Sequence, residues 1–133
     1  MDPAPPQGIV VREAHFPGRA PIDAYGNGGF RFADMSHKGA ILCLPSGIHG
    51  WEASPSDALT EAAFAAVLAE AKDIEVLLVG TGRDLRRIPP HLRERFRAAG
   101  ISADAMSTGA AVRTYNVLLA EDRAVAAALF AVD

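Results

Sequence analysis

The amino-acid sequence predicts an α/β fold with three layers, a mostly parallel central sheet with helices, and an N-terminal antiparallel β-hairpin region. From Lys38 onward, short apolar runs alternate with helical patterns, which is the element order of a parallel sheet covered by helices. Before that point, a glycine cluster separates two short apolar segments, as in a hairpin. Half of the 133 residues are hydrophobic and 22% are charged, a composition that excludes a disordered chain.

The length predicts one domain over residues 9–133, because a chain of this size buries one core. Residues 1–8 are expected to form a disordered tail, since their three prolines disfavour regular structure. Ile9–Val11 is the first predicted strand. Two more strands, at 22–25 and 30–32, flank the turn Gly26–Gly29, which can supply the positive φ values that a hairpin needs.

The middle of the chain predicts strand, helix and strand. Residues 40–44 are apolar without alternation and stop at Pro45, which is typical of a strand covered on both faces. Thr60 is a suitable N-cap for a helix, with Leu59 and Phe64 placed as a hydrophobic staple. The stripe of that helix comprises Phe64, Val67, Leu68 and Ala71. The next strand is expected over 75–79.

The last third predicts two helices and two strands. Pro89 or Pro90 marks the first turn of one helix and Gly100 its end. A weaker strand follows over 101–106, and Thr108 is expected to cap a helix that runs to about Leu119. The final apolar segment, 125–132, fits a buried strand by its unbroken run and a helix by its alanines, so both remain open.

Charge and composition limit the partners of the chain. A formal charge of −3 provides no general attraction for nucleic acid, so none is expected as a partner. No apolar stretch approaches the ~20 residues of a transmembrane helix, and the N-terminus does not resemble a signal peptide, so we expect a cytoplasmic location. The single cysteine, Cys43, excludes an intrachain disulfide and lies in a predicted buried strand, which indicates an inert thiol.

Two segments contain residue types that folding alone does not explain. They are Gly80-Thr81-Gly82, which follows an apolar run, and Thr108–Asn116, which combines small, cationic, aromatic and amide side chains. Open α/β sheets place ligands at the carboxyl ends of their strands, where the glycine turn would lie. The turn has two glycines of a dinucleotide fingerprint, but Leu85 occupies the position of the third, so a Rossmann site is not predicted. A tight turn with positive φ and a ligand loop both remain open.

Six arginines and two carboxylates lie between Arg83 and Arg97, although the chain as a whole is acidic. Arg83 and Arg86 follow the glycine turn, where they could bind a small anion or an acidic partner. Arg93 and Arg97 are spaced as one solvated helix face. On the next helix, Arg113 and Asn116 could bind a carboxylate or phosphate, or tie the helix to neighbouring backbone. The candidate binding residues are Gly80, Thr81, Gly82, Arg83, Arg86, Thr108, Arg113, Tyr115 and Asn116.

No catalytic residue, metal site or cofactor is predicted. Ser46 and His49 flank a glycine turn, but the nucleophile elbow of a hydrolase is absent and the sequence indicates no acidic partner. The four histidines (His15, His37, His49 and His91) are scattered, without the spacing of metal ligands. Trp51 is interpreted as a packing residue at the end of a short strand.

The chain resembles the Mth-type domain family in three places, namely Gly80-Thr81-Gly82, Thr108 to Asn116 with Ala111, Thr114 and Tyr115, and Arg123 before a terminal apolar strand. The resemblance runs from about Ile9 to Val132 and implies a compact three-layer α/β fold. Members of this family include a mitochondrial complex I assembly factor and an adipogenesis-associated protein. The chain departs from that mitochondrial branch because it has no arginine-rich, acid-poor presequence.

The sequence therefore predicts a non-enzymatic domain that assists the assembly of other proteins through an unidentified protein partner. Binding would centre on the Gly80–Arg87 turn and the Arg113–Asn116 part of the following helix. The alternative is a protein that binds an anion or small molecule, and that could be an enzyme, in the cleft near the same turn. The sequence does not indicate the oligomeric state.

Overall fold

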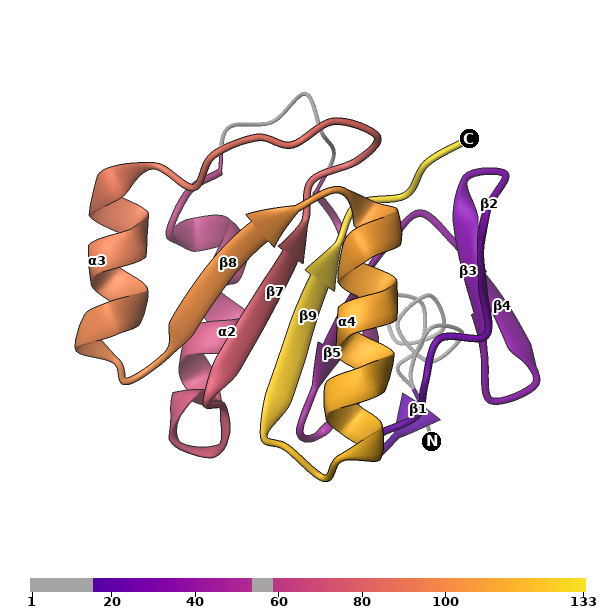
Figure 1. Ribbon diagram of the computed structural model, residues 1–133, viewed down its shortest axis with the longest axis horizontal. Coiled ribbons are helices and arrows are strands. Elements are labelled where there is room, and N and C mark those ends of the chain that lie inside the picture. Colours follow the sequence, from indigo (N-terminus) through magenta and orange to yellow (C-terminus); the bar gives the residue numbers. More distant parts are fainter. Residues whose placement is uncertain (1–15, 54–58) are drawn as a thin grey trace, which may run out of the picture.

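A mixed six-stranded sheet forms the centre of the computed structural model, which describes residues 16–53 and 59–133 (Figure 1). Its spatial order is β1-β6-β5-β9-β7-β8. The strands are β1 (Phe16–Pro17), β5 (Ala40–Leu44), β6 (Gly47–Trp51), β7 (Val76–Gly80), β8 (Ser102–Met106) and β9 (Val125–Leu129). Strands β8, β7 and β9 are parallel, and β9 pairs antiparallel with β5. The predicted α/β class with its parallel core is confirmed.

A smaller antiparallel sheet contains β2 (Ala24–Gly26), β3 (Gly29–Phe32) and β4 (Met35–Lys38). The turn between β2 and β3 confirms the predicted hairpin, because Asn27 and Gly28 have φ values of 53° and 80°. The strand predicted over 22–25 begins later, at Ala24, since both backbone groups of Ile22 bond to the side chain of Asn116. Strand β4 was not predicted, because its sequence is polar and lies half outside the core.

Helices and the small sheet cover the two faces of the central sheet. Helix α4 (Thr108–Ala120) and the β2–β4 sheet lie on one face, and α2 (Ala65–Ala69) and α3 (Pro90–Ala98) lie on the other (Figure 1). The core beneath α4 contains Phe30, Phe32, Val112 and Tyr115, among others. The core beneath α2 and α3 is built around Trp51, Phe64, Phe96 and Phe130.

The prediction of one continuous helix after Thr60 is wrong. The structure divides it into η1 (Ala62–Phe64), α2 and η2 (Ala71–Asp73). Thr60 does cap its start, because its hydroxyl accepts a hydrogen bond from Ala63 N–H at 3.2 Å. The break falls at Phe64, where φ is −105°, and this side chain is fully buried against Trp51 and Phe96. Packing of the ring therefore overrides the continuity of the helix.

Helix α3 confirms both sequence signals, with Pro90 in its first turn and Gly100 beyond its end at φ 86°. The strand predicted over 101–106 is confirmed as β8. The prediction that Thr108 caps α4 is wrong. Ser107 is the cap, accepting from Ala110 N–H at 3.3 Å, because the Thr108 hydroxyl is engaged elsewhere.

The ambiguous C-terminal segment forms a strand. β9 lies between β5 and β7 and all five of its residues are buried, so an apolar run suits the position on both faces. The strand ends at Leu129, three residues before the predicted limit. The tail over 1–8, the strand over Ile9–Val11 and His15 lie outside the described residues.

Candidate functional site

The end of β7 packs closely against α4. A Cβ atom placed on Gly80 would lie 3.0 Å from Thr108 Cα and 3.2 Å from Ala111 Cβ, distances tighter than ordinary contacts. It would also lie 2.9 Å from a methyl carbon of Leu129. Glycine at position 80 therefore allows α4 to pack against the parallel core, which is a structural role.

Two buried threonines hold the turn that follows. The Thr81 hydroxyl donates to the Asp84 carbonyl oxygen at 2.8 Å and accepts from Arg86 N–H at 3.0 Å. The Thr108 hydroxyl accepts from Gly82 N–H at 3.0 Å and donates to the Phe130 carbonyl at 2.7 Å. Gly82 adopts φ 103°, which confirms a turn that requires positive φ.

These bonds occupy the amides that would otherwise face a ligand. Thr81 N–H donates to the Met106 carbonyl at 2.9 Å, and Gly82 N–H donates to Thr108. An anion at this turn would therefore meet arginine side chains rather than the backbone of these two residues. A pocket does lie beside the turn, lined by Thr81, Gly82, Arg83, Asp84, Arg86, Ala131, Val132 and Asp133.

The buried threonines fix a loop whose tip is exposed. Arg83 and Arg87 are exposed, and Leu85 between them keeps 62% of its surface accessible. Arg86 is half-buried, and Ile88 returns to the core at 4% exposure. The result is a loop closed by internal hydrogen bonds that presents one apolar side chain, two cationic side chains and the carboxylate of Asp84 to solvent.

The arginines of α3 have other roles. Arg93 donates to the Ala103 carbonyl of the edge strand β8 at 3.0 Å. Arg95 pairs with Glu61 at 3.1 Å and Arg97 pairs with Glu94 at 3.1 Å, all with exposed side chains. The interpretation of Arg93 and Arg97 as a merely solvated face thus holds for Arg97, whereas Arg93 also covers a strand edge.

The two polar residues predicted in the middle of α4 tie the helix to the segment before β2. The buried Tyr115 hydroxyl donates to the Ala20 carbonyl at 3.1 Å. The Asn116 side chain accepts from Ile22 N–H and donates to the Ile22 carbonyl, both at 2.9 Å. The predicted alternatives for Asn116 were ligand binding and attachment of the helix to neighbouring backbone. Its contacts in the structure are those of backbone attachment. A ligand role for these two residues would require that these bonds break.

Arg113 differs from them because its side chain is exposed. One of its terminal nitrogens would lie 3.6 Å from a Cβ placed on Gly109. The hydroxyl of Tyr25, a residue 41% exposed, lies over the same glycine. The first turns of α4 therefore carry a surface formed by Tyr25 and Arg113. The beginning of α4 lies beside the carboxyl ends of β7, β8 and β9 (Figure 1).

Cys43 is a buried thiol, whereas the Ser46 hydroxyl is hydrogen-bonded to a carboxylate and a histidine. Cys43 is 1% exposed, and burial raises the pKa of its thiol to about 12, partly opposed by a hydrogen bond with Tyr115. Ser46 donates its hydroxyl hydrogen to Glu70 Oε2 at 2.6 Å and its N–H to Oε1 at 2.9 Å, while His49 Nε2 lies 3.0 Å from the hydroxyl. Glu70, which the sequence did not indicate, thus bonds to both the N–H and the hydroxyl of the serine.

Residues 16–53 and 59–133 contain neither a cluster of metal ligands nor a membrane-spanning helix. No three histidine, cysteine, aspartate or glutamate side chains of this part lie together in a way that could hold a metal ion. No helix in the same part is long and apolar enough to cross a membrane.

Comparison with known proteins identifies relatives for nearly the whole chain. The family model described as "Protein of unknown function (DUF498/DUF598)" matches residues 22–130. The crystal structure of an outer membrane protein from Bartonella henselae is 64% identical, with a TM-score of 0.85 over 90% of this chain and 100% of that chain. A Mth938-like domain from Bordetella pertussis is 28% identical, with a TM-score of 0.72 over 98% of this chain and 91% of that chain. The predicted resemblance to Mth-type domains is confirmed.

A curated relative carries a functional name. NADH dehydrogenase [ubiquinone] 1 alpha subcomplex assembly factor 3 from Mus musculus is 30% identical over 91% of this chain. The match covers 65% of the mouse protein, so the chain spans about two thirds of that relative. The shared region includes both segments of the candidate site.

Proposed function

Because the chain belongs to the DUF498/DUF598 family, whose relatives include assembly factors, we propose that it is a protein-binding domain that assists assembly. Its contact surface comprises loop 83–87 and the exposed side of the first turns of α4. The partner presents carboxylates and a small apolar pocket to this surface.

Loop 83–87 is the observation that carries the proposal. Its form is held by Thr81, whose hydroxyl bonds to the backbone of Asp84 and Arg86 from a position 2% exposed. Such a loop is preorganised, so little conformational entropy is lost when it binds. Its tip nevertheless exposes the apolar side chain of Leu85. Removing this side chain from water would contribute favourably to the free energy of binding a partner that covers it.

The charges around Leu85 indicate the chemistry of the partner. Arg83 and Arg87 lie two residues before and after it, and neither belongs to an ion pair among the described residues. Asp84 is the one exposed carboxylate of the loop, so the two exposed arginines leave it with a net positive charge. Arginine at an interface forms bidentate bonds with carboxylates and accelerates encounter with an acidic surface. Arg113 and Tyr25 add a guanidinium and an aromatic ring, two groups that are enriched at protein interfaces.

The test compares affinity for partners captured from the native cell by the wild-type protein. Each captured partner is purified, and its dissociation constant is measured for wild type, Leu85→Ser and the double variant Arg83→Ala with Arg113→Ala. Loss of the two charge-assisted contacts, worth ~2 kcal/mol, should weaken binding roughly thirtyfold. The matched control is Arg95→Ala with Arg97→Ala, which removes two arginines from α3 and should leave binding unchanged.

Wild-type affinity in the folded double variant would refute the proposed surface. Turnover of a metabolite by the wild type that the same variant loses would favour the enzyme instead. Amide spectra of each variant establish that the fold is retained before binding is compared.

The second candidate, a small-anion site, is supported by the pocket between the glycine turn and residues 131–133. Because Thr81 and Gly82 amides already donate within the chain, an anion there would be held by Arg83. Titration with inorganic phosphate should then shift the side-chain resonance of Arg83 saturably. Unchanged resonances at up to ~10 mM phosphate would eliminate a site of ordinary metabolite affinity.

A further inference from the structure

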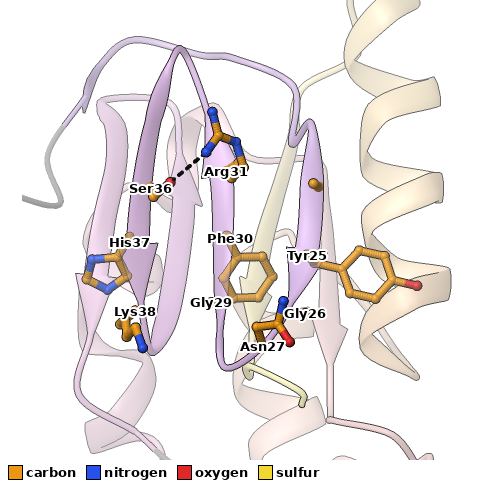
Figure 2. Close-up of a pocket in the computed structure, with 10 residues that line it drawn as sticks. Tyr25, Gly26, Asn27, Gly29, Phe30, Arg31, Ser36, His37 and Lys38 are labelled. Atoms are coloured by element: carbon orange, nitrogen blue, oxygen red, sulfur yellow. Dashed lines mark hydrogen bonds between the residues drawn. The ribbon is translucent and has the colours of Figure 1, made fainter.

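A hollow of about 290 Å³ lies on the solvent side of the β2–β4 sheet, and its lining residues are distinct from those of loop 83–87 (Figure 2). Its volume is near the lower end of the ~300–1,000 Å³ range of small-ligand sites. The lining comes from all three strands and from the turn that joins β2 to β3.

The pairing of the strands explains why the surface is hollow. Two cross-strand rows lie side by side on this face: Ala24–Arg31–Ser36 and Gly26–Gly29–Lys38. Gly29 cannot be replaced, because a Cβ would collide with the His37 carbonyl oxygen. A Cβ on Gly26 would meet no atom within 4 Å, which shows open space above it. The two glycines beside Lys38 therefore form the floor of the hollow, and this floor carries no side chains.

The charged side chains that line the hollow, Arg31 and Lys38, are both cationic. Arg31 and Lys38 occupy diagonal positions on neighbouring strands, about 7–8 Å apart at their backbones. Neither side chain belongs to an ion pair among the described residues, and the lining contains no carboxylate. Ser36 accepts a hydrogen bond from Arg31 Nη1 at 3.2 Å, which orients the guanidinium across the sheet (Figure 2).

The sheet that carries the hollow is firmly attached to the molecule. Phe30 and Phe32 project from β3 into the core and are 2% and 0% exposed. The Gly28 N–H in the turn donates to the Val132 carbonyl at 2.8 Å, and Gly39 N–H donates to the Gly28 carbonyl at 2.7 Å. The two cations are thus presented from a fixed scaffold, as binding sites require.

We propose that this hollow binds a small organic anion. Its carboxylate or phosphate group lies between the Arg31 guanidinium and the Lys38 ammonium, and a flat apolar body covers the floor above Gly26 and Gly29. The oxygens would receive charge-assisted hydrogen bonds from both cations. The apolar body suits the floor because its exposed surface is mostly carbon and carries no competing charge. The site adds a ligand to the domain. It shares no residue with loop 83–87 and shares Tyr25 with the proposed protein-binding surface.

The proposal is tested by titrating 15N-labelled protein with four probes. Phenyl phosphate and benzoate carry both features, inorganic phosphate carries only the charge, and benzamide carries only the ring. The first two should produce saturable amide shifts confined to Gly26, Gly29, Arg31, Ser36 and Lys38, and should bind at least about fivefold more tightly than either single-feature probe. Comparing phenyl phosphate with benzoate shows which anionic group the site prefers.

Variants establish which cation acts. Lys38→Ala and Arg31→Gln should each weaken phenyl phosphate binding about tenfold. Lys72→Ala is the matched control, because Lys72 is the other lysine of the chain and lies outside the hollow. If Lys38→Ala disturbs the fold, Lys38→Met keeps the stem of the side chain while removing its charge. Equal binding by benzamide, unchanged affinity in both charge variants, or shifts centred on loop 83–87 would each overturn the proposal.

Discussion

Burial determines the reactivity of the single cysteine, Cys43. Cys43 sits in β5 with 1% of its surface exposed and contacts the core beneath α4. Loss of hydration raises the pKa of the thiol from 9.0 to about 12. The nucleophilic thiolate is consequently depleted in the folded protein at physiological pH.

We expect Cys43 to react slowly with a thiol reagent such as DTNB in the native protein. Denaturation should accelerate labelling by roughly 100-fold or more, because reaction then no longer requires unfolding, whose free energy is typically several kcal/mol. Between pH 7 and 9 the native thiol should stay far less reactive than the denatured one at the same pH, since burial raises its pKa from 9.0 to about 12. Rapid native labelling that increases with pH around 8 would contradict a buried thiol.

The same pKa difference affects stability in alkaline solution. The thiol pKa is higher in the folded state than in the unfolded state, so its contribution to stability is complete below pH 9.0 and is lost as the pH rises toward about 12. Tyr115 adds to the loss in the same direction, because burial also raises the pKa of its phenol. Urea unfolding of wild type and Cys43→Ala should therefore diverge in pH dependence above pH 9.0.

Contacts between elements depend on a few hydroxyl groups. Thr108 stands at the beginning of α4, yet it bonds to Gly82 after β7 and to Phe130 after β9. One fully buried side chain thus links the helix to the ends of two parallel strands. The preceding Ser107 takes over the capping of the helix.

Replacing Thr108 by valine should lower the free energy of unfolding by about 1–3 kcal/mol, because the buried Gly82 N–H loses its acceptor while the side-chain shape is kept. Chemical denaturation measures the change. Thr114→Val is the matched control on the same helix, where no hydrogen bond of the hydroxyl is found among the described residues, and it should change stability by less than about 0.5 kcal/mol. Equal effects of both substitutions would indicate that helix propensity, not the Gly82 bond, determines the loss.

The molecule as a whole must protect the open edge of its central sheet. β8 pairs with β7 on one side and forms one end of the six-stranded order. Arg93 extends from α3 to the Ala103 carbonyl at 3.0 Å and so satisfies one group of that edge. Edge strands with unsatisfied backbone groups tend to pair with other chains.

We expect Arg93→Ala to increase self-association. The freed Ala103 carbonyl can then accept a hydrogen bond from a second molecule, so association should become roughly tenfold tighter. Light scattering during size-exclusion chromatography over a range of protein concentrations measures the effect. Arg97→Ala provides the control, because Arg97 bonds to Glu94 on its own helix. The same mass for both variants at every concentration would show that the edge is protected by other means.

The sequence determined the features that depend on neighbouring residues in the chain. Pro90 and Gly100 delimit α3, and the glycine turn defines the β2–β3 hairpin, because φ preferences act locally. The apolar run of β5 likewise reports burial on both faces. Exposed Arg83 and Arg113 were recognised as candidate contacts from residue type and position, and they remain the basis of the proposed surface.

Tertiary structure alone decided the rest, since it depends on contacts between distant segments. The order that places β9 between β5 and β7 converts an ambiguous alanine-rich run into a strand. The buried hydroxyls of Thr81 and Thr108 satisfy backbone groups of distant segments, and the sequence alone did not show these bonds. The hollow on the β2–β4 sheet arises because pairing aligns Gly26 and Gly29 beside Lys38, a register set by the hairpin turns and the burial of Phe30 and Phe32.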